Sequence, residues 1–447
     1  MSANELRQAD KTHLWHPFTQ MRDWCAVGHD PLVLVEGRGS MLVDAAGREY
    51  LDGNSSIWTN IHGHSHPHIV QAIQKQAAKL AHSSFLGLTN EPAIRLAEKL
   101  VALFPLGTLS RVFYSDDGST AIEVALKMAV QFHQLTGHPE RCHFAAFEHA
   151  YHGDSSGAAS LGGIAAFNDR FASLSFPVVR VADLTELEAL EPRTVQSLAG
   201  IVIEPLMQGA GGMRTWPTGL LRDLRDWCDR NNVFLILDEV MTGFGRTGKM
   251  FACQQEDVIP DFLALAKGLS GGTMPLAATL TTERVFAAFL GDYAEMKTLF
   301  YGHSYCGNPL GCAAALASLE VFAAERTLEN LQPKIQQMRV LLDELGGETH
   351  VGAVRQCGFM AGIDVARADG SPYPWQEETG ARICLAARRH GLLTRPIRDT
   401  LVLMPPLCFD SGQLADAVGA LRTAIREICG ENCHPRAFRI LLRVLSD

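Results

Sequence analysis

Short runs of consecutive apolar residues, separated by segments long enough to form helices, recur through the middle of this chain of 447 residues. A strand that is apolar on both of its faces has to be covered on both faces, which is typical of parallel sheets enclosed by helices. The sequence therefore predicts an α/β fold with a mainly parallel sheet. The expected strands are Arg111–Tyr114, His143–Phe147, Gly200–Ile203, Val233–Leu237, Phe262–Ala266 and Leu276–Leu280.

The segments on either side of this core follow different patterns. Before about residue 60, short apolar stretches alternate with turns, which predicts a small antiparallel meander. Ile69 and Ile73 then share one helical face, and Pro92 is expected at the first position of the next helix. A charged amphipathic helix is expected over Leu328–Leu345. We therefore expect a large domain over residues 66–325 and a smaller α/β domain built from residues 1–65 and 326–447.

Composition restricts the class of function. A net charge of −10 gives no basic surface for nucleic acid or an anionic membrane. The eleven cysteines form no C-x-x-C pair, which predicts reduced thiols and a cytoplasmic protein. We find no apolar export signal, and no run approaches the roughly 18 apolar residues of a membrane span. We expect an enzyme that acts on small molecules, with no nucleic-acid or membrane partner.

Lys267 and Asp238 are the residues that most suggest a chemistry. Lys267 ends an apolar run, and burial among apolar residues lowers the pKa of a lysine amine from its usual value of about 10.4. A neutral amine can form an imine with an aldehyde. Asp238 ends the strand Val233–Leu237, where a buried carboxylate would keep a pyridine nitrogen protonated. Together they predict pyridoxal-phosphate chemistry, with Glu204 as the alternative carboxylate.

Other polar residues also follow expected strands, at the edge where ligands of parallel sheets gather. Gly118 and Ser119 open an expected helix, so their N–H groups would either bind phosphate or simply form a helix start. Tyr151 would either stack on a cofactor ring or pack on its own domain. The glycine-rich segment 209–212 is either a flexible connection or a close backbone approach, and the sequence leaves both open.

Two further motifs suggest other functions. Gly243–Gly248 matches the G-x-G-x-x-G pattern of dinucleotide binding, but Asp238 and Glu239 separate it from the strand, and no clear helical pattern follows it. An NAD-dependent oxidoreductase is therefore the less favoured alternative. The histidine-rich run His62–His68 lacks cysteine or carboxylate neighbours, so we interpret it as a polar turn and expect no metal site.

Taken together, these motifs resemble those of the class III pyridoxal-phosphate aminotransferases, from about Trp15 to about residue 425. The resemblance implies the type I aminotransferase fold, pyridoxal 5'-phosphate bound in the large domain, and a homodimer with shared active sites. The matching motifs are Ser115-Asp116-x-Gly118-Ser119, Tyr151-His152-Gly153-Asp154, Glu204-Pro205 with Gln208–Gly212, Asp238–Gly248, Lys267-Gly268 and Gly307-Asn308-Pro309.

The resemblance also implies a role for particular residues. Lys267, Asp238 and Tyr151 would be catalytic: Lys267 would bond to the cofactor and move the substrate proton, and Tyr151 would stack on the ring. Ser304 would reach the phosphate across the dimer interface, and Arg395 would pair with a substrate carboxylate. The full cofactor set would be Gly118, Ser119, Tyr151, Asp238, Lys267 and Ser304, and the substrate set Trp58, Arg246, Gly302 and Arg395.

A second group of motifs resembles the branch of this family that converts 8-amino-7-oxononanoate to 7,8-diaminononanoate in biotin biosynthesis. These motifs are Trp15–Thr19, Ser55-Ser56-x-Trp58, Ile61–Pro67 and Arg395-Pro396. Members of this branch commonly use S-adenosylmethionine as amino donor. They carry tyrosine in the motif that here reads His16-Pro17-Phe18-Thr19, two adjacent tryptophans where this chain has Ile57-Trp58, and tyrosine near the position of Val402. Lysine is therefore the alternative donor. The alternative functions are another class III ω-aminotransferase and a non-catalytic protein of the same fold.

Overall fold

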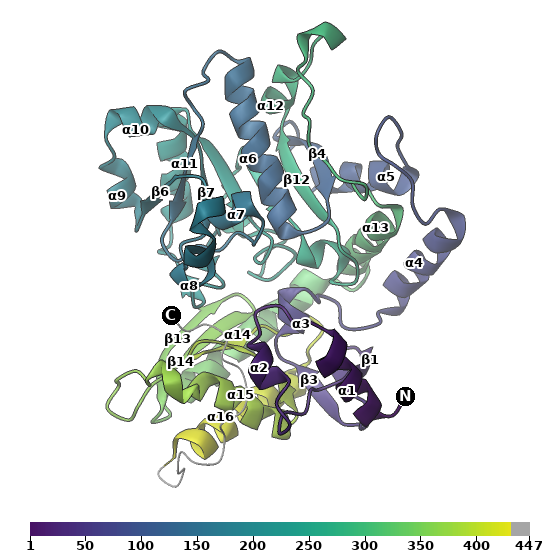
Figure 1. Ribbon diagram of the computed structural model, residues 1–447, viewed down its shortest axis with the longest axis vertical. Coiled ribbons are helices and arrows are strands. Elements are labelled where there is room, and N and C mark those ends of the chain that lie inside the picture. Colours follow the sequence, from purple (N-terminus) through teal and green to yellow (C-terminus); the bar gives the residue numbers. More distant parts are fainter. Residues whose placement is uncertain (431–447) are drawn as a thin grey trace. The chain divides into compact units, whose positions relative to one another are not determined.

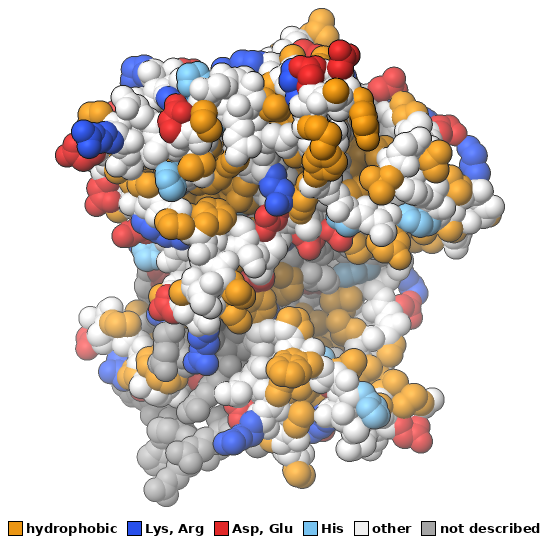
Figure 2. All heavy atoms as spheres, turned by 45° about the horizontal axis from the view of Figure 1, so that its top comes forward, with side chains coloured by type: hydrophobic (Ala, Val, Ile, Leu, Met, Phe, Trp, Pro, Cys, Tyr) orange, Lys and Arg blue, Asp and Glu red, His pale blue; other side chains and the backbone are white. Residues whose placement is uncertain are grey.

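The computed structural model describes residues 1–430, and the chain divides into two compact units (Figure 1). The larger unit is Pro67–Leu328, and the smaller consists of Met1–His66 together with residues 329–430. Among the described residues, no helix is long and apolar enough to cross a membrane. On the face shown in Figure 2, lysine and arginine side chains are scattered among acidic and hydrophobic ones.

The larger unit is built on a seven-stranded sheet with the order β4-β12-β11-β10-β7-β5-β6. Its strands are β4 Leu109–Ser115, β5 His143–Phe147, β6 Val178–Val181, β7 Leu198–Ile203, β10 Phe234–Asp238, β11 Phe262–Leu265 and β12 Ala277–Thr282, and a separate hairpin is formed by β8 Met207–Gln208 and β9 Arg214–Thr215. The strands β6, β5, β7, β10 and β11 pair in parallel with one another. The predicted α/β class with a mainly parallel sheet is confirmed.

One strand departs from the predicted parallel series. β12 runs antiparallel to both β11 and β4, so the expectation for Leu276–Leu280 is wrong in direction. The connection from β11 to β12 contains only the short 3-10 helix Lys267–Ser270, and a parallel strand would need a longer crossover. The strand β6 was not predicted, because its four residues are a weak signal.

Helices cover this sheet, and α6 lies along one face of it (Figure 1). The small buried residues Ala121, Ala125 and Ala129 of α6 allow this close packing. Pro92 occupies the second helical position rather than the first, because Asn90 caps the helix by accepting the N–H of Ala93. The helices are α4 Pro67–Lys79, α5 Glu91–Val101, α6 Gly118–Leu135, α7 Ser156–Leu161, α8 Ala165–Asn168, α9 Leu184–Glu188, α10 Pro192–Ser197, α11 Leu220–Asn231, α12 Glu283–Ala288 and α13 Pro309–Ala324, with 3-10 helices η1 Asp169–Leu174, η2 Ala252–Gln255, η3 Lys267–Ser270 and η4 Tyr293–Glu295.

The smaller unit combines residues from both ends of the described chain. The predicted meander is confirmed as β1 Leu34–Arg38, β2 Met41–Asp44 and β3 Glu49–Asp52, and β15 Leu392–Leu393 adds to it in parallel. A second antiparallel sheet has the order β13-β14-β17-β16. The remaining elements are α1 Ala3–His13, α2 Met21–Trp24, α3 Ser55–Trp58, β13 Val351–Cys357, β14 Met360–Val365, η5 Trp375–Glu377, α15 Thr379–Arg389, β16 Pro396–Ile397, β17 Thr400–Leu403 and α16 Ser411–Cys429, and α14 Thr327–Gly346 contains the expected amphipathic helix.

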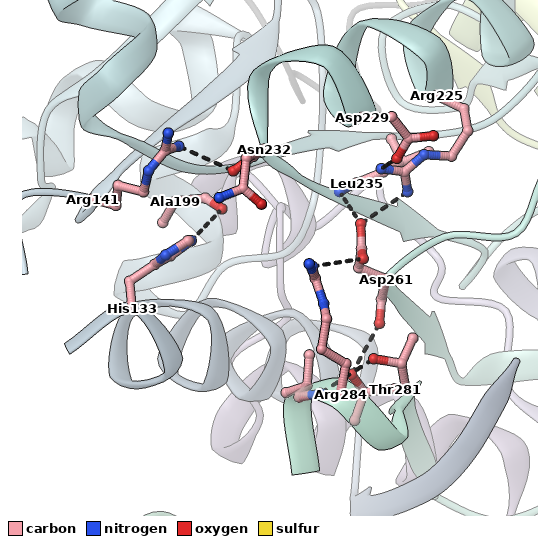
Figure 3. Close-up of polar contacts among 12 residues, drawn as sticks. His133, Arg141, Ala199, Arg225, Asp229, Asn232, Leu235, Asp261, Thr281 and Arg284 are labelled. Atoms are coloured by element: carbon pink, nitrogen blue, oxygen red, sulfur yellow. Dashed lines mark hydrogen bonds and ion pairs between the residues drawn. The ribbon is translucent and has the colours of Figure 1, made fainter. Parts of the chain in front are cut away.

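A polar network joins the strands of the large sheet to two helices (Figure 3). Asp261, just before β11, accepts the N–H of Leu235 at 2.9 Å and the guanidinium of Arg225 at 2.8 Å. Its other carboxylate oxygen lies 3.4 Å from Arg284, and its carbonyl accepts the hydroxyl of Thr281 at 2.9 Å. One aspartate therefore ties β10, β11 and β12 to α11 and α12.

His133 on α6 is buried beside β7 and β10 and is drawn with its partner Ala199 in Figure 3. Its Nε2 lies 3.3 Å from the carbonyl oxygen of Ala199, and its ring centroid lies 5.1 Å from that of Phe234. Burial lowers the pKa of His133 to about 4. Because a protonated imidazole loses hydration in this apolar setting, the folded protein keeps His133 neutral.

We expect His133 to make the protein less stable as the pH falls from about 6.5 to about 4, since the unfolded chain takes up a proton there that the folded chain does not. His133→Gln can still donate to Ala199 but cannot titrate. Thermal unfolding midpoints at about pH 7.5 and about pH 5 should therefore differ less in His133→Gln than in the original protein. His138→Gln, at an exposed position, is the control and should not reduce the difference. Equal losses in all three proteins would contradict the prediction.

Candidate functional site

Three neighbouring strands bring Glu204, Asp238 and Lys267 to the same edge of the large sheet. In the ladder, Ile203 pairs with Leu237, and Asp238 pairs with Ala264. Glu204 directly follows β7, Asp238 ends β10, and Lys267 begins η3 just after β11. The side chains of Glu204 and Asp238 are buried. The amine of Lys267, a half-buried residue, and two buried carboxylates therefore lie at one edge of the sheet.

The surroundings of Lys267 make its amine less basic than that of an ordinary lysine. Burial lowers the pKa of Lys267, the negative charges of Asp238 and Glu204 raise it, and Arg246 lowers it further. Lys267 also adopts a left-handed backbone conformation, with a φ of 46°. Such strain in a residue with a side chain persists where the surrounding structure enforces it, and it is common at functional sites.

Asp238 has a partner that the sequence did not reveal. The Nδ1 atom of His152 lies 2.7 Å from Oδ2 of Asp238, and both side chains are buried. The N–H of Val240 donates to Oδ1 of Asp238 at 3.1 Å. These contacts fix the orientation of the carboxylate. We did not single out His152, although its place beside Tyr151 after a buried strand was a usable signal.

Glu204 holds the backbone of two loops. Its carboxylate accepts the N–H of Tyr151 at 3.1 Å and the N–H of Gly209 at 2.8 Å. Burial raises the pKa of Glu204 to about 7. A Cβ atom on Gly211 would lie 2.4 Å from the carbonyl oxygen of His149, so the glycine-rich segment is a close backbone approach rather than a flexible connection.

Tyr151 is fixed at its hydroxyl as well as at its backbone. Its hydroxyl donates to Asp154 at 2.7 Å, and its ring meets Phe167 edge-on with centroids 5.7 Å apart. Burial raises the pKa of Tyr151, so it remains a neutral phenol. The tyrosine therefore presents an aromatic ring in a defined place on the loop after β5.

The N-terminus of α6 lies next to these residues. A Cβ atom on Gly118 would come within 2.7 Å of Val240, and one on Gly153 within 2.1 Å of the Ser119 hydroxyl oxygen. The Ser119 hydroxyl accepts the N–H of Asp154 at 3.2 Å and keeps its own hydrogen for donation. The first N–H groups of a helix have no acceptor within that helix and attract anions. The start of α6 therefore suits a phosphate group.

The remaining predicted residues lie in several places. Arg246 is fully buried in the larger unit, whereas Gly302 and Ser304 are exposed on the loop before α13. Trp58 ends α3 and Arg395 lies between β15 and β16, both in the smaller unit. Burial lowers the pKa of the Arg395 guanidinium.

The glycine-rich motif and the histidine-rich run, which suggested other functions, can now be placed in the structure. Gly243–Gly248 forms turns that lead into the short helix η2, not into the long helix that a dinucleotide requires. In the histidine-rich run, Nε2 of His64 lies 2.9 Å from Asp52, and Nδ1 lies 3.0 Å from the amide nitrogen of Asn60. Within residues 1–430, no group of three His, Cys, Asp or Glu side chains could hold a metal ion.

A strained turn at Ser55–Trp58 was not predicted. These four consecutive residues have left-handed φ values of 46°, 48°, 65° and 66°, which cost L-amino acids about 1–2 kcal/mol each. Asp52 opposes this strain by accepting the N–H of Ser56 at 3.0 Å and its hydroxyl at 2.8 Å. The indole N–H of Trp58 donates to Asn54 at 2.9 Å. The side chain of Trp58 is therefore held by an unusual backbone.

Comparison with known proteins gives the family. Residues 24–425 match the family model described as Aminotransferase class-III. The chain belongs to this family, as the sequence predicted, and it is a pyridoxal-phosphate-dependent transaminase. The features described above fit the cofactor: Lys267 is an amine of lowered basicity, Asp238 is a buried carboxylate, and the start of α6 suits a phosphate.

Similar proteins carry a more specific name. Two relatives called adenosylmethionine-8-amino-7-oxononanoate aminotransferase come from Nitratidesulfovibrio vulgaris (49% identity; 94% of this chain and 81% of the relative covered) and Geobacter sulfurreducens (46% identity; 95% and 98%). The crystal structure of the protein of the same name from Methanocaldococcus jannaschii has a TM-score of 0.92 and 41% identity, covering 95% of this chain and 99% of that one.

We expect Asp52→Ala to loosen the turn at Ser55–Trp58, because the strained backbone loses both contacts to Ser56. Amide hydrogen exchange of the peptide that spans this turn should become faster, and the protein should lose about 1–3 kcal/mol of stability. Asp44→Ala is a matched control, since Asp44 is also buried and accepts bonds from Arg48 and Tyr50. It should lower stability without changing exchange at the turn, and unchanged exchange in Asp52→Ala would refute the prediction.

Proposed function

We propose that this enzyme converts 8-amino-7-oxononanoate to 7,8-diaminononanoate in biotin biosynthesis, with S-adenosylmethionine as amino donor. The observation that carries the proposal is the cluster of Lys267, Asp238 and the start of α6 at one sheet edge. The choice of substrate is supported by relatives of 43–49% identity, each named adenosylmethionine-8-amino-7-oxononanoate aminotransferase.

Each of the residues at the sheet edge has a separate role in the proposed reaction. When bound, pyridoxal 5'-phosphate supplies an electron-withdrawing ring that carries the amino group from donor to acceptor. Lys267, with its lowered pKa, attaches the cofactor through Nζ and later serves as the base that moves the substrate proton. Asp238, oriented by His152, keeps the pyridine nitrogen protonated. Tyr151 offers its ring for stacking.

We assign phosphate binding to Gly118 and Ser119. Both lie in the larger unit, which we propose is the cofactor-binding domain. We further propose a cytoplasmic homodimer in which Ser304 reaches the partner's phosphate. Its loop supports this, because Phe300 and Tyr305 are 74% and 59% exposed in the single chain. Exposed aromatic side chains of this kind commonly mark a protein interface.

We assign substrate binding to four residues, Trp58, Arg246, Gly302 and Arg395. Burial weakens the hydration of the Arg395 guanidinium, as its lowered pKa indicates, so an incoming carboxylate would stabilise it. A guanidinium can bind both carboxylate oxygens at once. We therefore assign Arg395 to the distant carboxylate of 8-amino-7-oxononanoate.

The amino donor depends on aromatic groups that this chain lacks. A sulfonium cation gains about 0.5–2 kcal/mol from each aromatic face that it contacts. Ile57 is aliphatic and 47% exposed, and Val402 is buried in β17. These residues favour S-adenosylmethionine less than aromatic side chains would, so lysine is the second candidate donor.

Lys267→Ala should abolish both transamination and covalent attachment of the cofactor. Borohydride reduction of the protein with pyridoxal phosphate, followed by peptide mass spectrometry, should label Lys267 in the original protein and no lysine in the variant. Lys249→Ala is the control, because Lys249 is exposed and donates to the carbonyl of Gln254. Reducible attachment that persists in Lys267→Ala would disprove the assignment.

The donor can be identified without the keto substrate. We expect S-adenosylmethionine, added alone to the enzyme with bound cofactor, to bleach the visible absorbance as the amino group is taken up. Lysine at the same concentration should act much more slowly, on the order of tenfold or more, if the sulfonium is recognised. Rapid bleaching by lysine and none by S-adenosylmethionine would identify lysine as the amino donor, and the proposed product would stay the same.

A further inference from the structure

The loop after β5 is attached to the site at three points. The N–H of Tyr151 donates to Glu204 at 3.1 Å, and His152 lies 2.7 Å from Asp238. The N–H of Asp154 donates to the hydroxyl of Ser119 at 3.2 Å. Each contact joins the loop to a different element, namely the ends of β7 and β10 and the start of α6. The loop position therefore depends on all three partners.

Glu204 is the partner that joins this loop to a second one. Its other oxygen accepts the N–H of Gly209 at 2.8 Å, and Gly211 lies against the backbone of His149. Both loops are strained, since His149 and Leu206 have left-handed φ values of 61° and 65°. Two backbone N–H donors on one buried carboxylate favour its ionised form and hold both loops in this conformation.

The charges around Glu204 link it to the reacting amine. His152 and Asp238 face it from the loop after β5 and the end of β10, and Tyr151 lies beside it. Burial raises the pKa of Glu204 to about 7, while His152 lowers it. Glu204 in turn raises the pKa of Lys267, together with Asp238 and against the effect of Arg246. Loss of the Glu204 charge would therefore weaken proton binding at Lys267.

We propose that Glu204 is a positioning residue for transamination: its carboxylate holds the backbone of Tyr151, and with it the ring, while its charge favours a proton on Nζ of Lys267. This inference rests on the proposed cofactor chemistry. It adds to the cofactor-binding set a residue that acts through Tyr151 and Lys267.

The test uses the enzyme with bound pyridoxal phosphate and its visible absorbance as a function of pH, which reports proton binding at Nζ of Lys267. Glu204→Gln removes the charge at nearly constant volume. Its absorbance midpoint should shift to lower pH by about one unit. Its cofactor dissociation constant should rise about tenfold, because an amide NH₂ group cannot accept the second N–H.

Two further variants separate the parts of the proposal. Glu204→Asp keeps the charge but is too short for both N–H groups, so its midpoint should stay near that of the original protein while cofactor affinity falls. Glu239→Gln is the matched control. Glu239 is fully buried and accepts the N–H groups of Ala252 and Cys253 at 2.6 and 2.8 Å. This variant should lose thermal stability without a shift of the midpoint.

The outcomes distinguish this inference from the function on which it rests. A protein that never develops a visible band with pyridoxal phosphate would overturn the proposed function. A normal band, with an unchanged midpoint and affinity in Glu204→Gln, would overturn the role of Glu204 alone. A shift of the absorbance midpoint in Glu239→Gln as large as that in Glu204→Gln would also overturn the role of Glu204. If Glu204→Gln does not fold, undiminished affinity in Glu204→Asp would overturn the positioning role.

Discussion

The contact between Asp238 and His152 is the interaction on which the rest of the site depends. A carboxylate buried at the end of a strand loses its hydrogen bonds to water, and partners within the protein have to compensate for them. His152 and the N–H of Val240 provide this compensation at 2.7 and 3.1 Å. The charge of Asp238 then acts on Lys267, whose basicity it partly restores against burial. The polar groups of the site therefore depend on one another: Asp238 depends on His152, and the basicity of Lys267 depends on Asp238.

Close backbone packing keeps these charges together. Gly118 lies against Val240, Gly153 against Ser119, and Gly211 against His149, at distances where no side chain would fit. The glycines therefore let three loops and a helix start converge on the ends of β7, β10 and β11. The apolar sheet behind the site, held at its other end by Asp261, is rigid enough to support the left-handed conformation of Lys267.

The two units differ in how their strain is held. In the larger unit, the strained residues His149 and Leu206 lie in two loops whose backbone N–H groups donate to the buried carboxylate of Glu204. In the smaller unit, the turn Ser55–Trp58 is strained over its full length. It is held by Asp52, the last residue of β3, and by Asn54, which directly precedes the turn. Both arrangements place an aromatic side chain, Tyr151 or Trp58, on a backbone with little freedom.

The sequence by itself determined the α/β class and the positions of most strands, and it singled out the groups to which we assign the chemistry. Local properties suffice for this, because an apolar run followed by Asp238 or Lys267 marks a strand and a polar group at its end. The direction of β12 was decided only by the tertiary structure, since a buried strand has the same local pattern in either direction. The partnership of His152 and Asp238 joins residues 86 positions apart. The basicity of Lys267 and of Glu204 was likewise decided in three dimensions, because a pKa depends on burial and on charges that reach the site from different strands.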